Sequence, residues 1–393
     1  MRKIVVIVFS DSSLGGTSRS AITMAKAWRR LDRDIVFVPF GAVNDKRLVQ
    51  LKTLGEVNTL YELDWSLVEL VHWHHGANDI QNKHILESLS ANAPAGTPLL
   101  THNIFGSPDY ALRQWAGPQV TAVLGDWAAY EYRFASGRRT PVPLVIGNPQ
   151  DDYFFRPPQE KERLLARESL QVDEGSHVVL RAGSPLISKW STSYLRLARS
   201  LERNDVVLVL VGVPASLVPL LSPLSHVRLL PLTDNDARLR SLYWAADVFA
   251  LDAEQGESFG NVAIESLLTG CPVVYRAREF RDNTPWEFRT LSGFYYEKNE
   301  RDWIARIGTL VDAPREGVDY MMAAQKYGVG AVAAKLDAAA TQLLGRGTRP
   351  DSRLPATLGY GQRLRVRLRH NPWANELKII RRRNGWYGTR SRG

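Results

Sequence analysis

Two glutamates eight residues apart have the chemistry to bind the hydroxyl groups of a small molecule. Glu257 and Glu265 stand in the stretch EQGESFGNVAIESLLTGCPVV. The pattern predicts a strand over residues 247–251, then a loop that holds Glu257, and then a helix from Gly260 to Thr269 that a following glycine ends. Glu265 falls on the first or second turn of this helix. Both carboxylates can therefore face one cleft from the same wall.

The predicted start of this helix has the chemistry to bind an anion. The backbone N–H groups of Phe259, Gly260 and Asn261 have no carbonyl partner within the helix and carry partial positive charge. A phosphate at this terminus, with carboxylates beside it that accept hydroxyl groups, would make a site for a sugar nucleotide. The residues leave a second interpretation open, in which both glutamates are solvated charges of a loop and a helix.

Two further loops follow predicted strands, one with two glycines and one with two cations. Gly15 and Gly16 follow the first apolar run and precede a helical pattern, where glycine lets the backbone approach a ligand closely. An ordinary turn would use the same residues. In RAGSPLISKWS, the cations Arg181 and Lys189 lie at and after the end of a predicted strand.

A histidine-rich stretch, VHWHHGAND, ends another predicted strand. Metal binding is disfavoured, because Asp79 is the one carboxylate that accompanies His72, His74 and His75 at ligand spacing. The histidines either fill structural positions or point into a cleft. The same alternatives apply to His102, which stands at the end of the next strand.

The elements that carry these residues alternate between apolar, β-branched runs and amphipathic helical patterns. This alternation predicts α/β units with parallel sheets and helices on both faces. The runs form two series of about five strands, which predicts two doubly wound, Rossmann-like domains. The expected strands are KIVVIVF, RDIVFVPF, LVELVHW, PLLTHN and VTAVLG, followed by HVVLRAG, DVVLVLVG, VRLLPL, DVFALD and CPVVYR.

A proline-rich stretch separates the two series, so we place one domain at residues 1–157 and a second at residues 158–345. Ligands of such sheets bind outside the carboxyl ends of the strands. Two domains that face each other therefore enclose a central cleft, which the loops described above would line. The longest uncharged stretch, residues 206–227, contains glycine and prolines and is predicted to include a buried strand, not a transmembrane helix.

The charge distribution sets the end of the chain apart. The chain carries 50 basic and 41 acidic residues, and residues 346–393 hold 13 of the former and 2 of the latter. The tail interleaves arginine with leucine, valine and tryptophan, a composition that suits an anionic membrane surface. A solvated tail or binding to another anion stays possible, and nucleic acid is disfavoured because no binding motif accompanies the charges. The single cysteine, Cys271, excludes an intrachain disulfide and fits a cytoplasmic location.

The segment ESFGNVAIESLLTGCPVV resembles the E-x7-E segment of retaining GT-B glycosyltransferases, particularly those of glycosyltransferase family 4. The resemblance implies that Glu257 contacts the donor sugar and that Glu265 holds the nucleotide ribose. It places Ser258 and the amides that follow it along the donor. Gly15 and Gly16 match the Gly-Gly loop of the family.

This chain departs from the family pattern at one position. The family follows the first strand of its second domain with Gly-Arg, four residues and Lys-Gly, and the two cations neutralise the donor diphosphate. Here Gly183 and Lys189 keep the spacing, but Ser184 stands at the position of the arginine. Arg181 could supply the missing charge only if the strand shifts. A histidine after the strand of the first domain, here His74 or His75, would face the donor sugar or the acceptor.

The resemblance therefore implies an enzyme that moves a sugar from a nucleotide-diphosphate sugar to a glycan or lipid-linked acceptor with retention of configuration. Surface polysaccharide or glycolipid synthesis, with the protein peripheral on the inner face of the membrane, would fit. No cofactor and no obligatory metal are expected, because no Asp-X-Asp ends a strand of the first domain. The alternatives are a sugar-nucleotide epimerase of the same fold and a non-catalytic protein that binds sugar nucleotides.

Overall fold

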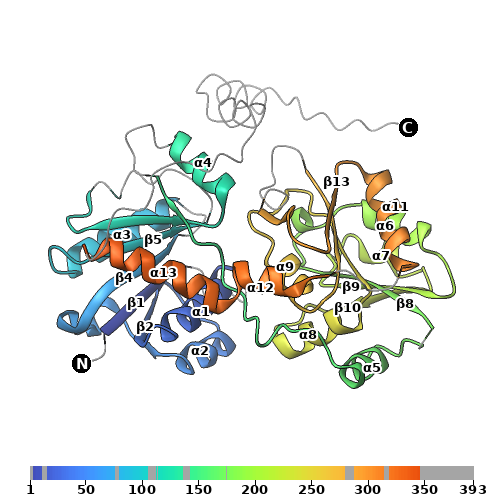
Figure 1. The fold of residues 1–393 in the computed structure, drawn as a ribbon, viewed down its shortest axis with the longest axis horizontal. Coiled ribbons are helices and arrows are strands. Elements are labelled where there is room, and N and C mark those ends of the chain that lie inside the picture. Colours follow the sequence, from blue (N-terminus) through green and yellow to red (C-terminus); the bar gives the residue numbers. More distant parts are fainter. Residues whose placement is uncertain are drawn as a thin grey trace.

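A computed structural model describes residues 3–10, 16–75, 79–104, 112, 114–135, 142–173, 175–278, 287–313 and 318–345. It contains two parallel sheets with helices packed on both faces, as the alternating pattern predicts, and Figure 1 shows the two sheet units side by side. Gly15 and the basic tail, residues 346–393, lie outside the described residues.

The first sheet has seven strands in the order β3-β2-β1-β4-β5-β6-β7. They are β1 (Lys3–Phe9), β2 (Arg33–Pro39), β3 (Glu56–Val57), β4 (Val68–His75), β5 (Leu99–Asn103), β6 (Gln119–Val123) and β7 (Leu144–Val145). The helices of this half are α1 (Gly16–Arg29), α2 (Asp45–Lys52), α3 (Asp79–Asn92) and α4 (Asp126–Ala135).

The second sheet has six strands in the order β10-β9-β8-β11-β12-β13. They are β8 (His177–Ala182), β9 (Val206–Val211), β10 (Val227–Leu230), β11 (Val248–Leu251), β12 (Val273–Arg276) and β13 (Phe294–Glu297). The helices along this part of the chain are α5 (Glu160–Glu168), α6 (Ser193–Ser200), α7 (Val218–Leu221), α8 (Asp236–Ala245), α9 (Asn261–Leu268), α11 (Glu300–Val311) and α12 (Tyr320–Tyr327).

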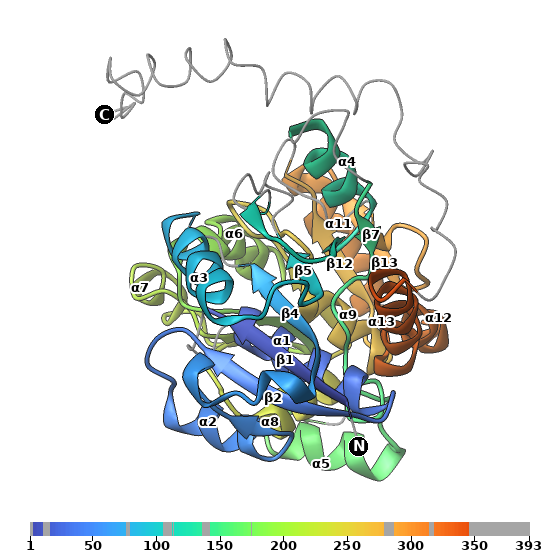
Figure 2. The same ribbon diagram turned by 90° about the vertical axis from the view of Figure 1, so that its left-hand side faces the viewer.

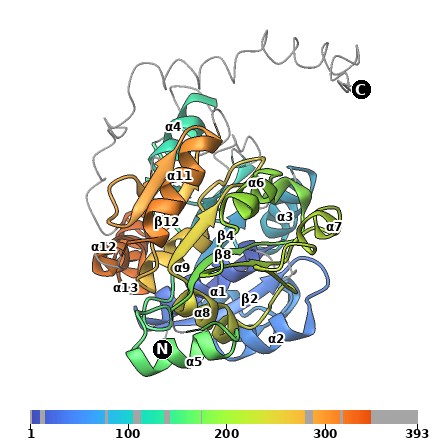
Figure 3. The same cartoon turned by 90° about the vertical axis from the view of Figure 1, so that its right-hand side faces the viewer.

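Helices bury both faces of each sheet. In the first unit α1 shares a core with Ile7 and Phe37 on one face, while α3 packs on Val6 and Val71 on the other. Figure 2 shows α3 and the last helix, α13 (Val329–Leu343), on opposite sides of β4. In Figure 3, α5 and α8 lie on one side of strands β8 and β12 of the second unit, and α6 and α11 on the other. Strands covered on both faces explain the continuous apolar runs.

After α12 the described part of the chain returns to the first unit. After α12, which packs in the core of the second unit, α13 buries Val332 and Leu336 in the core that α1 shares with the first sheet. α13 therefore packs with the first unit, although along the chain it follows the second unit. Within the described ranges, every helix is too short or too polar to cross a lipid bilayer.

In each sheet the strand order reverses beside the first strand of the unit. β1 lies between β2 and β4, and β8 lies between β9 and β11. The loops after β8 and β11 therefore begin at the carboxyl edge where the strand order reverses, which is the place where ligands of open α/β sheets bind.

Candidate active site

Lys189 and Glu257 form an ion pair at the reversal point of the second sheet. Lys189 ends a short 3-10 turn after β8, and Glu257 lies in the loop between β11 and α9. Lys189 Nζ is 2.6 Å from Glu257 Oε2, and the two side chains are 26% and 13% exposed. Two residues that the sequence predicts in one site therefore meet there, and solvent reaches both. A cation beside a carboxylate suits a ligand that has both phosphate and hydroxyl groups.

The loop after Glu257 has the shape expected from its glycines. Gly260 caps α9 with a φ of +87°, in the left-handed region that glycine adopts without strain, and Gly270 follows the helix with a φ of +73°. Ser258, which directly follows Glu257, is half-buried. The Phe259 side chain is buried against Phe288 and Tyr327, so its backbone, and not its ring, lies at the helix start.

Asn261 contacts the segment that connects the two units. Its Oδ1 accepts hydrogen bonds from Asn148 Nδ2 at 3.2 Å and from Gln150 Nε2 at 3.1 Å. The first residue of α9 is thereby fixed to the crossover.

Glu265 is fully buried and faces the first unit. Its Oε1 lies 3.0 Å from Arg19 Nη1 on α1, and its Oε2 accepts a hydrogen bond from the Tyr243 hydroxyl at 3.1 Å. Arg19 also pairs with Asp236 at 3.2 Å. Burial raises the pKa of Glu265, and the Arg19 guanidinium opposes this rise only in part. The second glutamate of the motif is thus held by a residue of the other unit.

Arg181 lies inside the second unit. It is 1% exposed, and its guanidinium donates to the backbone oxygens of Ala182 and, at 2.9 Å, of Lys189. The guanidinium also lies over the Trp190 ring, 5.2 Å from the centroid. Arg181 therefore holds the loop that carries Lys189 from inside the second unit.

The histidines separate onto two faces of β4. His74 pairs in register with His102 on β5, and with His72 these rings pack together, with centroid distances between 4.7 and 5.8 Å. His75 points to the opposite face, where its Nδ1 lies 3.3 Å from Asn82 Nδ2. Successive strand residues alternate between faces. His74 and His102 thus lie together, and His75 lies apart from them.

His72, His74 and His102 are the described residues with the spacing of a metal site, since one nitrogen from each lies within 4.8 Å of the others. The Trp28 indole N–H donates to His72 Nδ1 at 2.9 Å. An indole can only donate, so the proton of a neutral His72 must sit on Nε2, the nitrogen that would have to bind the ion. This hydrogen bond disfavours a three-histidine centre. Burial lowers the pKa of His102 to about 3 and those of the other two well below the usual value.

The Gly-Gly loop can be placed only in part. Gly16 is the first residue of α1. The helix that it begins carries Arg19 one turn later.

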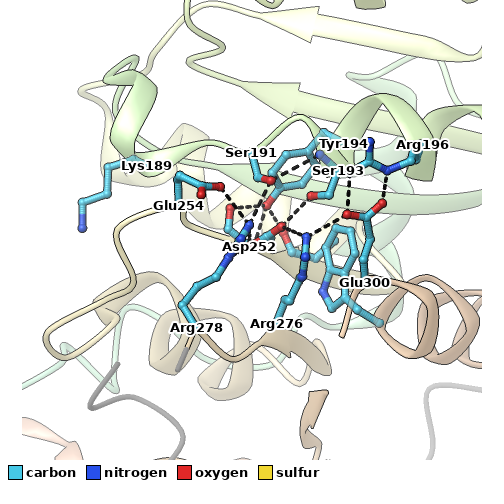
Figure 4. A network of polar contacts seen from close by, with 12 residues as sticks. Lys189, Ser191, Ser193, Tyr194, Arg196, Asp252, Glu254, Arg276, Arg278 and Glu300 are labelled. Atoms are coloured by element: carbon cyan, nitrogen blue, oxygen red, sulfur yellow. Dashed lines mark hydrogen bonds and ion pairs between the residues drawn. The ribbon is translucent and has the colours of Figure 1, made fainter. Parts of the chain in front are cut away.

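A second network of charged residues lies at the carboxyl edge of the second sheet, and Figure 4 shows it. Asp252, directly after β11, is fully buried and pairs with Arg276 at 3.0 Å and with Arg278 at 2.6 Å. Ser193 donates a further hydrogen bond to Asp252, and Arg276 reaches Glu300 at 3.0 Å.

Sequence reasoning missed Arg19, Tyr243 and the arginines of this network. The signal for Asp252 and Arg276 is their place at the ends of predicted strands, DVFALD and CPVVYR, and Arg278 follows two residues after the second of these. Arg19 has no comparable signal, because a charged residue on an amphipathic helix is usually solvated.

Comparisons with known proteins identify the fold. No family model and no curated protein matches the sequence. Among solved structures, HepE of Anabaena in complex with UDP-glucose is similar with a TM-score of 0.68 and 16% identity, over 86% of this chain and 99% of that one. A glycosyltransferase from Rickettsia africae has a TM-score of 0.66 and 13% identity, over 88% of this chain and all of that one.

A third similar structure is WaaG, described as a glycosyltransferase involved in lipopolysaccharide biosynthesis. Its TM-score is 0.56 and its identity 14%, over 87% of this chain and all of that one. The two sheets in the order described above, at this level of similarity, give the chain the GT-B fold of these glycosyltransferases.

Proposed function

We propose that this protein transfers a sugar from a nucleotide-diphosphate sugar to a hydroxyl group of a glycan or lipid-linked acceptor, with retention of anomeric configuration. The observation that carries the proposal is the Lys189–Glu257 ion pair, because it unites a cation and a carboxylate at the reversal point of the second sheet. The fold similarity to HepE with bound UDP-glucose supports an activated sugar as the ligand.

The proposed reaction breaks the bond between the anomeric carbon and the diphosphate, whose oxygen takes the bonding electrons. The acceptor oxygen bonds to the anomeric carbon on the same face, and its proton passes to the leaving phosphate oxygen. Lys189 Nζ stabilises the charge that develops on the phosphate. Glu257 accepts hydrogen bonds from the sugar hydroxyls and supports the positive charge on the ring. Neither residue needs to form a covalent intermediate.

Further residues have proposed roles around this pair. The backbone of Ser258, Phe259, Gly260 and Asn261 would lie along the donor phosphates, and Glu265 would accept the ribose hydroxyls. Gly15 and Gly16 would line the donor from the first unit. The similarity to WaaG supports a glycolipid acceptor. Attachment to an anionic membrane through residues 346–393 stays a prediction.

The test is a screen of UDP-, GDP- and ADP-sugars with the wild-type protein and Glu257→Gln. Calorimetry measures donor binding, and turnover is followed with and without acceptor glycolipids. We expect Glu257→Gln to lower kcat by about a hundredfold while donor affinity changes little, because the carboxylate acts on charge that develops in the transition state.

The alternatives give different results in the same screen. Isomerisation of a donor without any acceptor would indicate an epimerase. Tight binding without turnover for every acceptor would indicate a binding protein, for which Ser184 at the arginine position is the one sequence argument. Wild-type rates in Glu257→Gln would remove this residue from the sugar.

A further inference from the structure

A diphosphate donor needs more positive charge than Lys189 alone supplies. Arginine and lysine act together in the pattern that the chain resembles, and Ser184 takes the place of the arginine. Arg181 does not fill the gap, since it is 1% exposed and its guanidinium is bonded to the backbone oxygens of Ala182 and Lys189. A second cation near the Lys189–Glu257 pair would strengthen the binding of a diphosphate.

Arg278, just beyond β12, reaches the loops that carry the ion pair. Its Nη2 donates to Ser191 Oγ at 2.9 Å, two residues after Lys189, and lies 3.1 Å from Glu254 Oε2, three residues before Glu257. A backbone hydrogen bond from Gln255 to Ser188 at 3.0 Å joins these two loops. In Figure 4, Glu254 and Arg278 meet at one end of the network, and Lys189 lies beyond Glu254 with its ammonium group turned away from Arg278.

The two acidic partners of Arg278 differ in how firmly they are held. Asp252 is 0% exposed and is fixed by Arg276 and Ser193 as well, so it anchors the guanidinium from inside the protein. The side chain of Glu254 is 55% exposed and that of Arg278 18%. An exposed ion pair contributes little stability. A phosphate oxygen can therefore replace the Glu254 carboxylate on Arg278 while Asp252 keeps the arginine in place.

We propose that Arg278 binds the diphosphate of the nucleotide donor, and that Glu254 occupies this position on Arg278 in the free protein. The proposal rests on the proposed function, because it names a binding residue of the same site. Arg276 pairs with Asp252 from the other side, and Arg276 also pairs with Glu300.

The experiment compares nucleoside diphosphates with nucleosides by calorimetry on the full chain. UDP, GDP and ADP are titrated, and the tightest binder is then compared with its own nucleoside in three variants. Arg278→Gln should weaken the diphosphate about tenfold or more, since a charge-assisted hydrogen bond is lost, and leave the nucleoside unchanged. Glu254→Gln should strengthen the diphosphate about two- to fivefold, because the competing carboxylate is gone.

Arg203→Gln is the matched control, because Arg203 also pairs with two carboxylates, Asp205 and Asp312, on the exposed surface. Equal losses for diphosphate and nucleoside in Arg278→Gln would assign Arg278 a purely structural role and overturn the proposal. If Arg278→Gln does not fold, Glu254→Gln decides, and wild-type diphosphate affinity in that variant refutes the proposal. Failure of every diphosphate to bind the wild-type protein would instead overturn the proposed function, and this proposal with it.

Discussion

Glu265 is a carboxylate with two protein partners already in place. Arg19 reaches it from α1 and Tyr243 from α8, and no part of its side chain is exposed. Glu257, by contrast, is partly exposed beside Lys189. Ribose hydroxyls would have to replace one of the partners of Glu265, so the nucleotide binding proposed at this residue would be coupled to the contact between the two units.

Arg19→Met tests this contact through stability. The change leaves Glu265 and Asp236 without their shared cation, and removal of one partner from a buried ion pair costs about 3 kcal/mol. We expect the free energy of unfolding in urea to fall by an amount of this order. In the double variant Arg19→Met with Glu265→Gln, part of the loss should return, because a neutral amide needs no counter-charge. A single variant as stable as the wild type would show that the pair contributes nothing.

The sequence predicts some of these residues better than others, for a physical reason. Lys189 and Glu257 each follow a recognisable strand, and their contact requires only that those two strands be neighbours in the sheet. The partner of Arg19 lies in the other unit. Periodicity along a chain describes how one element packs locally and contains no information on how two units approach each other.

The same limit appears among the elements. All ten strands expected from apolar runs are present, while β3, β7 and β13 were missed. β3 and β7 have two residues each, too few to form an apolar run, and β13 buries only the first of its four residues. The helix at residues 261–268 and the glycines that bound it were predicted correctly, because a left-handed φ at each end favours glycine.

Strands β4 and β5 bring three imidazoles together in the protein interior, where all three are fully buried. His74 and His102 have both ring nitrogens buried without a hydrogen-bond partner in the described part of the chain. Burial disfavours the charged form, so the pKa of His102 falls to about 3 in the folded protein, against about 6.5 when unfolded. The unfolded chain therefore binds more protons between these values, and stability declines as pH falls from about 6.5 to 3.

His102→Leu should remove the contribution of this residue to acid sensitivity. Its free energy of unfolding should change less between pH 7 and pH 5 than that of the wild type. At pH 7 the variant should be at least as stable, since an unpartnered buried polar group is replaced by an apolar one. Urea unfolding monitored by circular dichroism at both pH values measures the difference. An unchanged pH dependence would mean that the ring is protonated or solvated in the folded protein.

At the scale of the whole molecule, Glu287 joins the two units. It lies before β13, and its Oε1 accepts a hydrogen bond from the Trp127 N–H, at the start of α4 in the first unit, at 3.4 Å. A Cβ added at Gly125 would lie 2.1 Å from the carboxyl carbon, so only glycine allows this approach. Burial, with a smaller effect of Asp126, raises the pKa of Glu287 to about 7, while Lys326 opposes the rise.

Glu287 therefore gives the molecule a pH dependence opposite to that of the histidines. Its pKa is raised from about 4.5 when unfolded, so the folded protein binds more protons between pH 4.5 and 7, and stability falls as pH rises through this range. A shift of this size corresponds to about 3 kcal/mol. Between pH 4.5 and 6.5 the contribution of Glu287 therefore opposes that of His102.

Glu287→Gln should change how the free energy of unfolding depends on pH. The amide can still accept the hydrogen bond from Trp127 and has no charge to bury, so the contribution that declines with pH disappears while that of His102 remains. The free energy of unfolding of the variant should then rise from pH 4.5 to 6.5 more steeply than that of the wild type, and above pH 7 the variant should be the more stable protein. Urea titrations at half-unit pH steps measure both curves, with Glu168→Gln, at an exposed position, as the control. Parallel curves for Glu287→Gln and the wild type would show that this carboxyl titrates alike in the folded and unfolded chains, and that the interface between the units does not respond to pH through Glu287.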